Sequence, residues 1–127
     1  YAAAELVDAQ DDVVYFSTII PTGFVSLSKA VLVIIAKGTG NMRRLSDALY
    51  AAVGEAPNAN SGAIAVADVA VTTNVITELD MSAGSQLASL AAGDRLGLAF
   101  TRLGAHANDT VTASVFVLGL LLEYSIV

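Results

Sequence analysis

Apolar and polar positions along this chain follow the short periods of β-strands over most of its length. Val13–Ile20 is rich in β-branched and aromatic residues, and the turn-forming Pro21-Thr22-Gly23 follows it. Phe24–Ala36 is apolar at both odd and even positions, which predicts a strand covered on both faces. Lys37–Asn41 has the glycines and polar residues of a turn. This part of the chain therefore predicts two β-strands.

Residues 42–54 fit two different structures. Met42, Leu45, Leu49 and Val53 recur at helical spacing, and alanine and leucine favour a helix. The same leucines share one face if the segment is extended. A sandwich topology needs a strand at this point, so we prefer the strand and keep the helix as the alternative.

The second half of the chain alternates between loops and short apolar segments. Ala56–Gly62 reads as a loop, and Ala63–Val71 as a strand of small residues. Thr72–Asn74 interrupts this strand, which resumes over Val75–Leu79. We expect a short helical turn near residues 85–91.

The last third predicts a closing hairpin. Arg95–Leu103 is a strand, Gly104–Asp109 its polar tip, and Thr110–Ile126 a long final strand. Many short strands separated by turn residues indicate a sandwich or barrel rather than βαβ units. We therefore predict an all-β fold, an antiparallel β-sandwich of jelly-roll type over residues 13–127, preceded by an N-terminal arm over residues 1–12.

The chain has more apolar residues than one domain of this size is expected to bury. The chain has 127 residues, 55% of them hydrophobic, and a mean hydropathy of +0.67. Its longest apolar run, Val115–Leu122, is shorter than the roughly 20 residues of a membrane helix, so we expect no membrane insertion. We expect instead a homo-oligomer, a trimer, that covers one face of the two long apolar strands. The predicted interface residues are Val31, Val33, Ile35, Val115, Val117, Leu120, Leu122 and Tyr124.

The charges exclude one class of partner. The formal net charge is −6, from 12 acidic and 6 basic residues, and four of the acids lie in the arm, which we expect to reach a neighbouring subunit. The arginines are scattered and lysine is scarce, so the sequence has no basic stripe for phosphates and no nucleic-acid binding is expected. The absence of cysteine rules out disulfides and thiolate metal sites.

Candidate catalytic groups are few. His106 is the sole histidine, and without a second His or a Cys it lacks companions for a metal site or a nucleophile–base pair. The aspartates lie beside turns and strand ends, where such side chains cap backbone donors. We expect no enzyme activity, no metal and no cofactor. If the loops carry recognition of a receptor or glycan, the candidate residues are Asn58, Asn60, His106, Asn108 and Asp109.

Several short motifs occur in a familiar order. They are Pro21 near the first strand, Leu79-Asp80 before a short turn, Ala92-Gly93-Asp94 at a strand entry, the Asp109-Thr110 loop, and Leu118-Gly119 with Tyr124 in the last strand. This order resembles the small β-sandwich modules of tailed-bacteriophage virion structural proteins, which decorate capsids or are appended to tails and fibres. The resemblance implies a virion protein that acts through its surface and contacts other virion proteins. The alternative is a receptor- or glycan-binding sandwich that works through its loops, with a host-surface glycan as its partner.

Overall fold

Strands in the structure begin and end at the turn residues of the sequence. A computed structural model describes residues 3–127. Its strands and one short 3₁₀ helix are β1 (Ala4–Leu6), β2 (Asp11–Ile19), β3 (Phe24–Ala36), β4 (Gly40–Ala51), β5 (Asn60–Val71), β6 (Ile76–Asp80), η1 (Ala83–Ser85), β7 (Arg95–Leu103) and β8 (Val115–Ile126). The all-β prediction is confirmed.

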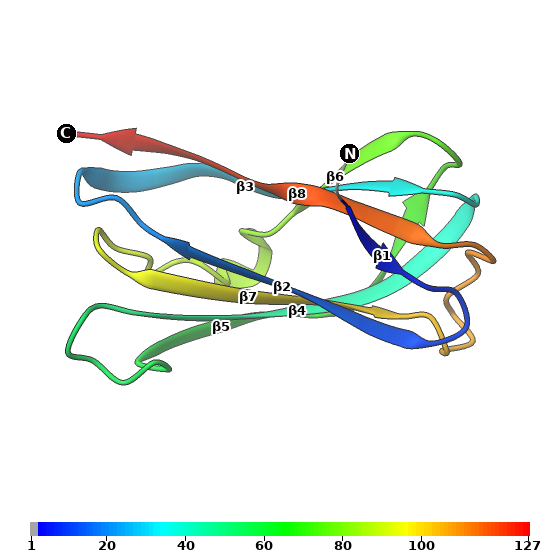
Figure 1. Cartoon of the computed structure of the whole chain (residues 1–127), viewed down its shortest axis with the longest axis horizontal. Helices are drawn as coiled ribbons and strands as arrows, with labels where there is room; N and C mark the ends of the chain where they lie inside the picture. The colour runs from blue at the N-terminus through cyan, green and yellow to red at the C-terminus, as the bar shows by residue number, and fades with distance from the viewer. Residues whose placement is uncertain (1–2) are drawn as a thin grey trace.

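The strands form two four-stranded sheets that pack face to face (Figure 1). Sheet A has the order β1-β8-β3-β6, and sheet B has the order β2-β7-β4-β5. Neighbouring strands in both sheets are antiparallel. The chain passes from one sheet to the other at most connections, and this order is that of an eight-stranded jelly roll. The predicted jelly-roll sandwich is therefore confirmed.

Two uncertain segments are settled by strand pairing. The segment that also fitted a helix is strand β4, which lies between β5 and β7 in sheet B. Ladder bonds on both sides outweigh the helical propensity of its alanines and leucines. The prediction that one strand resumes after Thr72–Asn74 is wrong, because β5 belongs to sheet B and β6 to sheet A. The interruption is the crossing between the two sheets.

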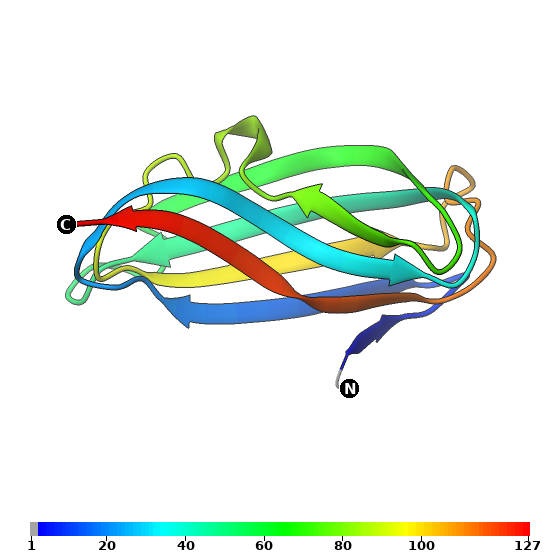
Figure 2. The same cartoon turned by 90° about the horizontal axis from the view of Figure 1, so that it is seen from above.

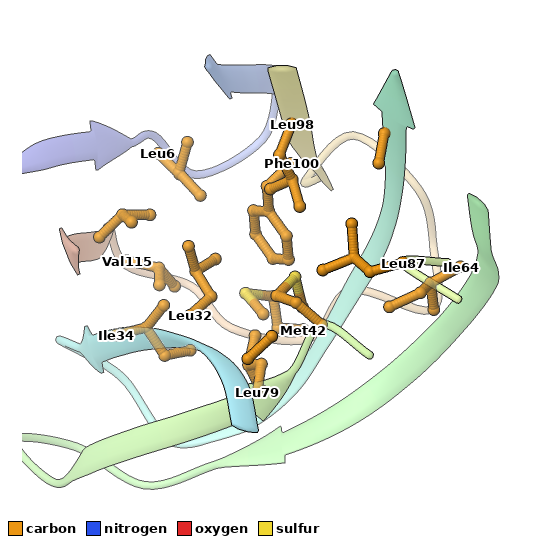
Figure 3. Packing of buried hydrophobic residues seen from close by; sticks show 14 of the residues in the cluster. Leu6, Leu32, Ile34, Met42, Ile64, Leu79, Leu87, Leu98, Phe100 and Val115 are labelled. Carbon is orange, nitrogen blue, oxygen red and sulfur yellow. The ribbon is translucent and has the colours of Figure 1, made fainter. Parts of the chain in front are cut away.

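The core lies between the sheets and is built by alternate residues of each long strand. Leu32 and Ile34 come from β3, Met42 from β4, and Leu98 and Phe100 from β7. Their side chains meet in the space between the sheets (Figure 3). Removing these side chains from water supplies the main driving force for folding, at about 25 cal/mol per Å² of apolar area.

The segment after β6 closes the side of the sandwich formed by β5 and β6 (Figure 2). The 3₁₀ helix and the turns that follow it reach Leu90, so the predicted helical turn is found slightly earlier than expected. Gln86 is fully buried: its amide nitrogen donates to the Met81 carbonyl oxygen at 2.7 Å, and Ser46 Oγ donates to its amide oxygen at 2.9 Å. These bonds fasten the segment to β4 and to the end of β6.

Asp80 organises the start of this segment and gives a testable pH response. Its carboxylate accepts hydrogen bonds from the Ser82 hydroxyl at 2.6 Å and the Ser82 backbone N–H at 2.9 Å. These bonds favour the ionised form and hold the pKa of Asp80 below its ordinary value. The stability they contribute is present above the unfolded-state pKa and is lost as pH falls through the folded-state pKa. In Ser82→Ala the pKa of Asp80, measured by NMR titration, should rise toward the ordinary value. An unchanged pKa would contradict this assignment.

The predicted N-terminal arm contributes a strand of its own. Residues Ala4–Leu6 pair with Val115–Val117 of β8, and Leu6 is buried in the core. Ser114 Oγ donates to Glu5 at 2.7 Å, and the backbone N–H of Val7 donates to Asp12 at 2.6 Å. This part of the arm therefore lies against its own sandwich, whereas Tyr1 and Ala2 are outside the described residues.

Candidate functional site

Sheet A carries apolar side chains on the face that points away from the core. We call this surface the apolar outer face, and its residues are Val33, Ile35, Ile76, Phe116, Leu118 and Leu121. It is hollowed by a shallow depression of about 490 Å³, lined by Ala3, Ile35, Lys37, Ile76, Phe116 and Leu118. Ile76 is 64% exposed and Leu121 is 39% exposed. Contiguous apolar surface of this kind commonly marks an interaction site.

The predicted interface residues of β3 and β8 do not share one face. Val31, Val33 and Ile35 have the parity opposite to the core residues of β3, as expected for the outer side. Val115 and Val117 lie in the core, so the structure corrects their placement on an outer surface. Leu120 and Leu122 also pack against the core from within. Tyr124 is 40% exposed and its ring lies 5.7 Å from that of Phe24.

A β-bulge explains this difference. Val33 is paired with Gly119, but its neighbour Ile34 is paired with Val117, so Leu118 is an extra residue on β8. An extra residue reverses the alternation of side chains on the strand. Residues of odd number face the core before the bulge, and residues of even number do so after it. The outer residues Phe116, Leu118 and Leu121 were therefore missed, although a glycine inside a strand such as Gly119 often marks a bulge.

The two loops expected to carry recognition lie at opposite ends of the sandwich (Figure 1). Asn58 is exposed in the β4–β5 connection, and Asn60 is the first residue of β5, beside the end of β4. His106 and Asn108 are exposed in the β7–β8 connection, beside the start of β4. One ligand cannot contact both groups unless it spans the molecule.

Asp109 differs from the other loop residues because its side chain is fully buried. It forms a bidentate ion pair with Arg102, whose side chain is also fully buried, with distances of 2.9 and 3.0 Å. The carboxylate also accepts the backbone N–H groups of Arg43 and Val111. Asp109 is therefore a structural residue in this fold and is not accessible for recognition.

The Arg102 guanidinium uses all five of its N–H donors. Two of them bind Asp109, and the other three donate to the carbonyl oxygens of Leu6, Val111 and Ala113 at 3.0, 2.6 and 2.8 Å. The hydrogen bonds of the Arg102 guanidinium thus connect β7 to the N-terminal strand and to the loop before β8. The alternation of residues along β7 could have indicated that Arg102 is buried, because it has the same parity as the core residues Leu98 and Phe100.

Residues 3–127 contain no group of three or more His, Cys, Asp or Glu side chains placed to hold a metal ion. Asp94 is buried and accepts the backbone N–H of Ala91 at 2.8 Å, which confirms its expected role in closing a turn. Within the same residues, no helix has the length and apolar character to cross a membrane.

Charged pairs lie at the edges of the two outer surfaces. Lys29 Nζ is 3.0 Å from Glu78 on sheet A, and this contact raises the pKa of Lys29. Arg43 pairs with Asp68 at 3.0 Å on sheet B. Burial lowers the pKa of Arg44. Exposed pairs of this kind contribute little stability.

Comparison with known proteins finds no matching family model, no matching curated protein and no matching solved structure.

Proposed function

We propose that this chain is a structural protein of a virion, one that decorates a capsid or belongs to a tail or fibre. It acts as a homo-oligomer, a trimer, and its work is adhesion through surfaces rather than catalysis. The observation that carries this proposal is the apolar outer face of sheet A. The order of the short sequence motifs, which resembles that of bacteriophage structural modules, supplies the virion setting.

The physical argument concerns exposed apolar surface. Phe116, Leu118 and Leu121 lie beside Val33 and Ile35 on neighbouring strands, so their side chains form one patch rather than scattered positions. Burying such a patch releases free energy in proportion to its apolar area, about 25 cal/mol per Å². A second or third copy that covers the patch protects it from water and from unspecific association.

A substitution that places a charge on the apolar outer face tests whether this face forms the oligomer contact. Phe116→Asp should abolish the trimer contact and lower the mass of the assembly, because a carboxylate in an apolar contact is desolvated without a partner. We expect the association to weaken by at least about 100-fold. Sedimentation velocity at micromolar concentration measures this effect.

A matched control for this experiment is Tyr15→Asp. Tyr15 is 76% exposed on β2 of the other sheet, so the same charge is placed on an exposed aromatic position outside the apolar outer face. The control should remain trimeric. A monomeric wild-type protein, or equal loss of mass in both variants, would contradict the proposed oligomer.

The virion role needs a separate test. Antibodies against the purified protein should label intact virus particles in electron micrographs, at the capsid surface or along the tail. Particles that carry no label, with the protein found only in the soluble fraction, would contradict it.

A further inference from the structure

One long stretch of β8 has no partner strand on one side among residues 3–127. In sheet A, β8 lies between β1 and β3. It pairs with β3 along nearly its whole length, from Val115 to Ile126, but β1 covers only Val115–Val117. No described strand lies beside residues 118–126 on that side, and Figure 2 shows β8 continuing far beyond the end of β1.

The direction of the free groups follows from the bonds around β3. Met81 donates to the Ala30 carbonyl oxygen and Asn74 to that of Ala36, so the even-numbered residues of this part of β3 face β6. Because backbone directions alternate along a strand, the odd-numbered residues face β8, and Val31 pairs there with Leu121. On β8 the N–H and C=O groups of Leu120, Leu122 and Tyr124 must then point away from β3, to the side where the structure describes no strand.

A groove runs beside this edge, between β8 and β2. It has a volume of about 340 Å³, and its lining includes Phe16, Ile20, Leu120, Leu122 and Tyr124. The side chains of an added strand that point inward would enter this groove. Unpaired strand edges without lysine or proline are ready templates for another strand. In residues 118–126 the single charged residue is Glu123, whose side chain faces outward beside Lys29.

We propose that a second copy of this chain fills the site, with the β8 strands of the two copies paired antiparallel about a twofold axis at Leu122. In this register Leu120 lies opposite Tyr124 of the second copy, and Leu122 lies opposite its own equivalent. Inward apolar side chains therefore meet inward apolar side chains, and Glu123 lies opposite Leu121 rather than another acid. About six main-chain hydrogen bonds form across the junction.

A second copy fits this edge better than an unrelated segment because the contact is self-complementary. One twofold contact pairs the exposed edges of both molecules at once, and the two free stretches have the same length. Sheet A becomes continuous across the two copies. This inference depends on the β8 edge alone and does not require the apolar outer face or the proposed virion role.

The test uses single cysteines in a chain that has none of its own. Leu122→Cys places two thiols opposite each other across the twofold, within the Cα separation that a disulfide needs. Ser125→Cys is the matched control, because Ser125 is exposed on the same strand outside the apolar outer face, and in this register its two equivalents lie too far apart for a disulfide. Under mild oxidation, Leu122→Cys should form a covalent dimer about tenfold faster than the control. Equal rates, or faster cross-linking of the control, would overturn the proposal.

A second pair of variants distinguishes the contribution of the backbone N–H of Tyr124 from that of its side chain. In the Leu122→Cys background, Tyr124→Pro removes an N–H donor that faces the open edge, while Tyr124→Val removes the same ring but keeps the donor. Cross-linking should be lost with proline and retained with valine, with both variants shown to be folded by circular dichroism. Retained cross-linking with proline would overturn strand pairing. If Phe116→Asp abolishes the trimer while Leu122→Cys still cross-links, the β8 contact forms independently of the apolar outer face.

Discussion

Replacing Arg102 with methionine should lower the free energy of unfolding by about 3–5 kcal/mol, the usual cost of removing one partner from a buried ion pair. The substitution leaves the Asp109 carboxylate buried without its counter-ion. It also removes the donors that satisfy the carbonyl oxygens of Leu6, Val111 and Ala113. Urea denaturation followed by circular dichroism measures the change.

Two further variants make this test specific. Arg95→Met changes an exposed arginine whose side chain donates to the nearby Gly93 carbonyl oxygen, and it should shift stability by less than about 0.5 kcal/mol. Adding Asp109→Leu to Arg102→Met should restore part of the loss, because no charge is then buried alone. The restoration should be incomplete, because three carbonyl oxygens stay without donors and the backbone N–H groups of Arg43 and Val111 lose their acceptor. A loss below about 1 kcal/mol in Arg102→Met would contradict a structural role for this pair.

Gly62→Ala should destabilise the protein by about 3 kcal/mol, at the upper end of ordinary overpacking. A Cβ atom at Gly62 would be 2.7 Å from the Cα of Gln86 and would overlap its carbonyl oxygen. The obstacle is backbone, so no rotamer change relieves it. Gln86 cannot withdraw easily, because its side chain is bonded to Ser46 and Met81 in the core.

Gly119→Ala is the matched control for this prediction. Gly119 also lies in a strand, but a Cβ there meets nothing within 4 Å. Alanine should therefore be tolerated within about 0.5 kcal/mol. Thermal unfolding at low protein concentration compares the two variants, and similar melting temperatures would show that β5 does not pack tightly on the 83–90 segment.

Local sequence patterns predicted the strands well where burial follows a simple period. Phe24–Ala36 and Arg95–Leu103 have the same bounds in the sequence analysis and in the structure. Turn residues bound both segments. β7 alternates without interruption, and the two register shifts of β3, near Val25 and Ser28, leave the alternation of residues 30–36 intact. The outward parity of Val33 and Ile35 followed from the same alternation.

The candidate site was harder to predict, for a reason that can be traced to one residue. The extra residue Leu118 reverses the faces of β8, so the predicted interface there contained core residues and omitted Phe116 and Leu121. Asp109 was expected in a recognition loop because a polar residue between strands is usually exposed. Its burial depends on Arg102, seven positions earlier in the chain.

By itself the sequence determined the all-β class, the places of most strands, and the lack of a cysteine or a second histidine. These properties depend on residue type and on neighbours a few positions away. Only the tertiary structure decided that β5 and β6 belong to different sheets and that the two polar loops lie at opposite ends. It also decided that residues 118–126 of β8 have, within the described part of the chain, no partner strand on the side of the groove. Each of these depends on which distant strand lies alongside, and that choice is made by the packing of the whole core.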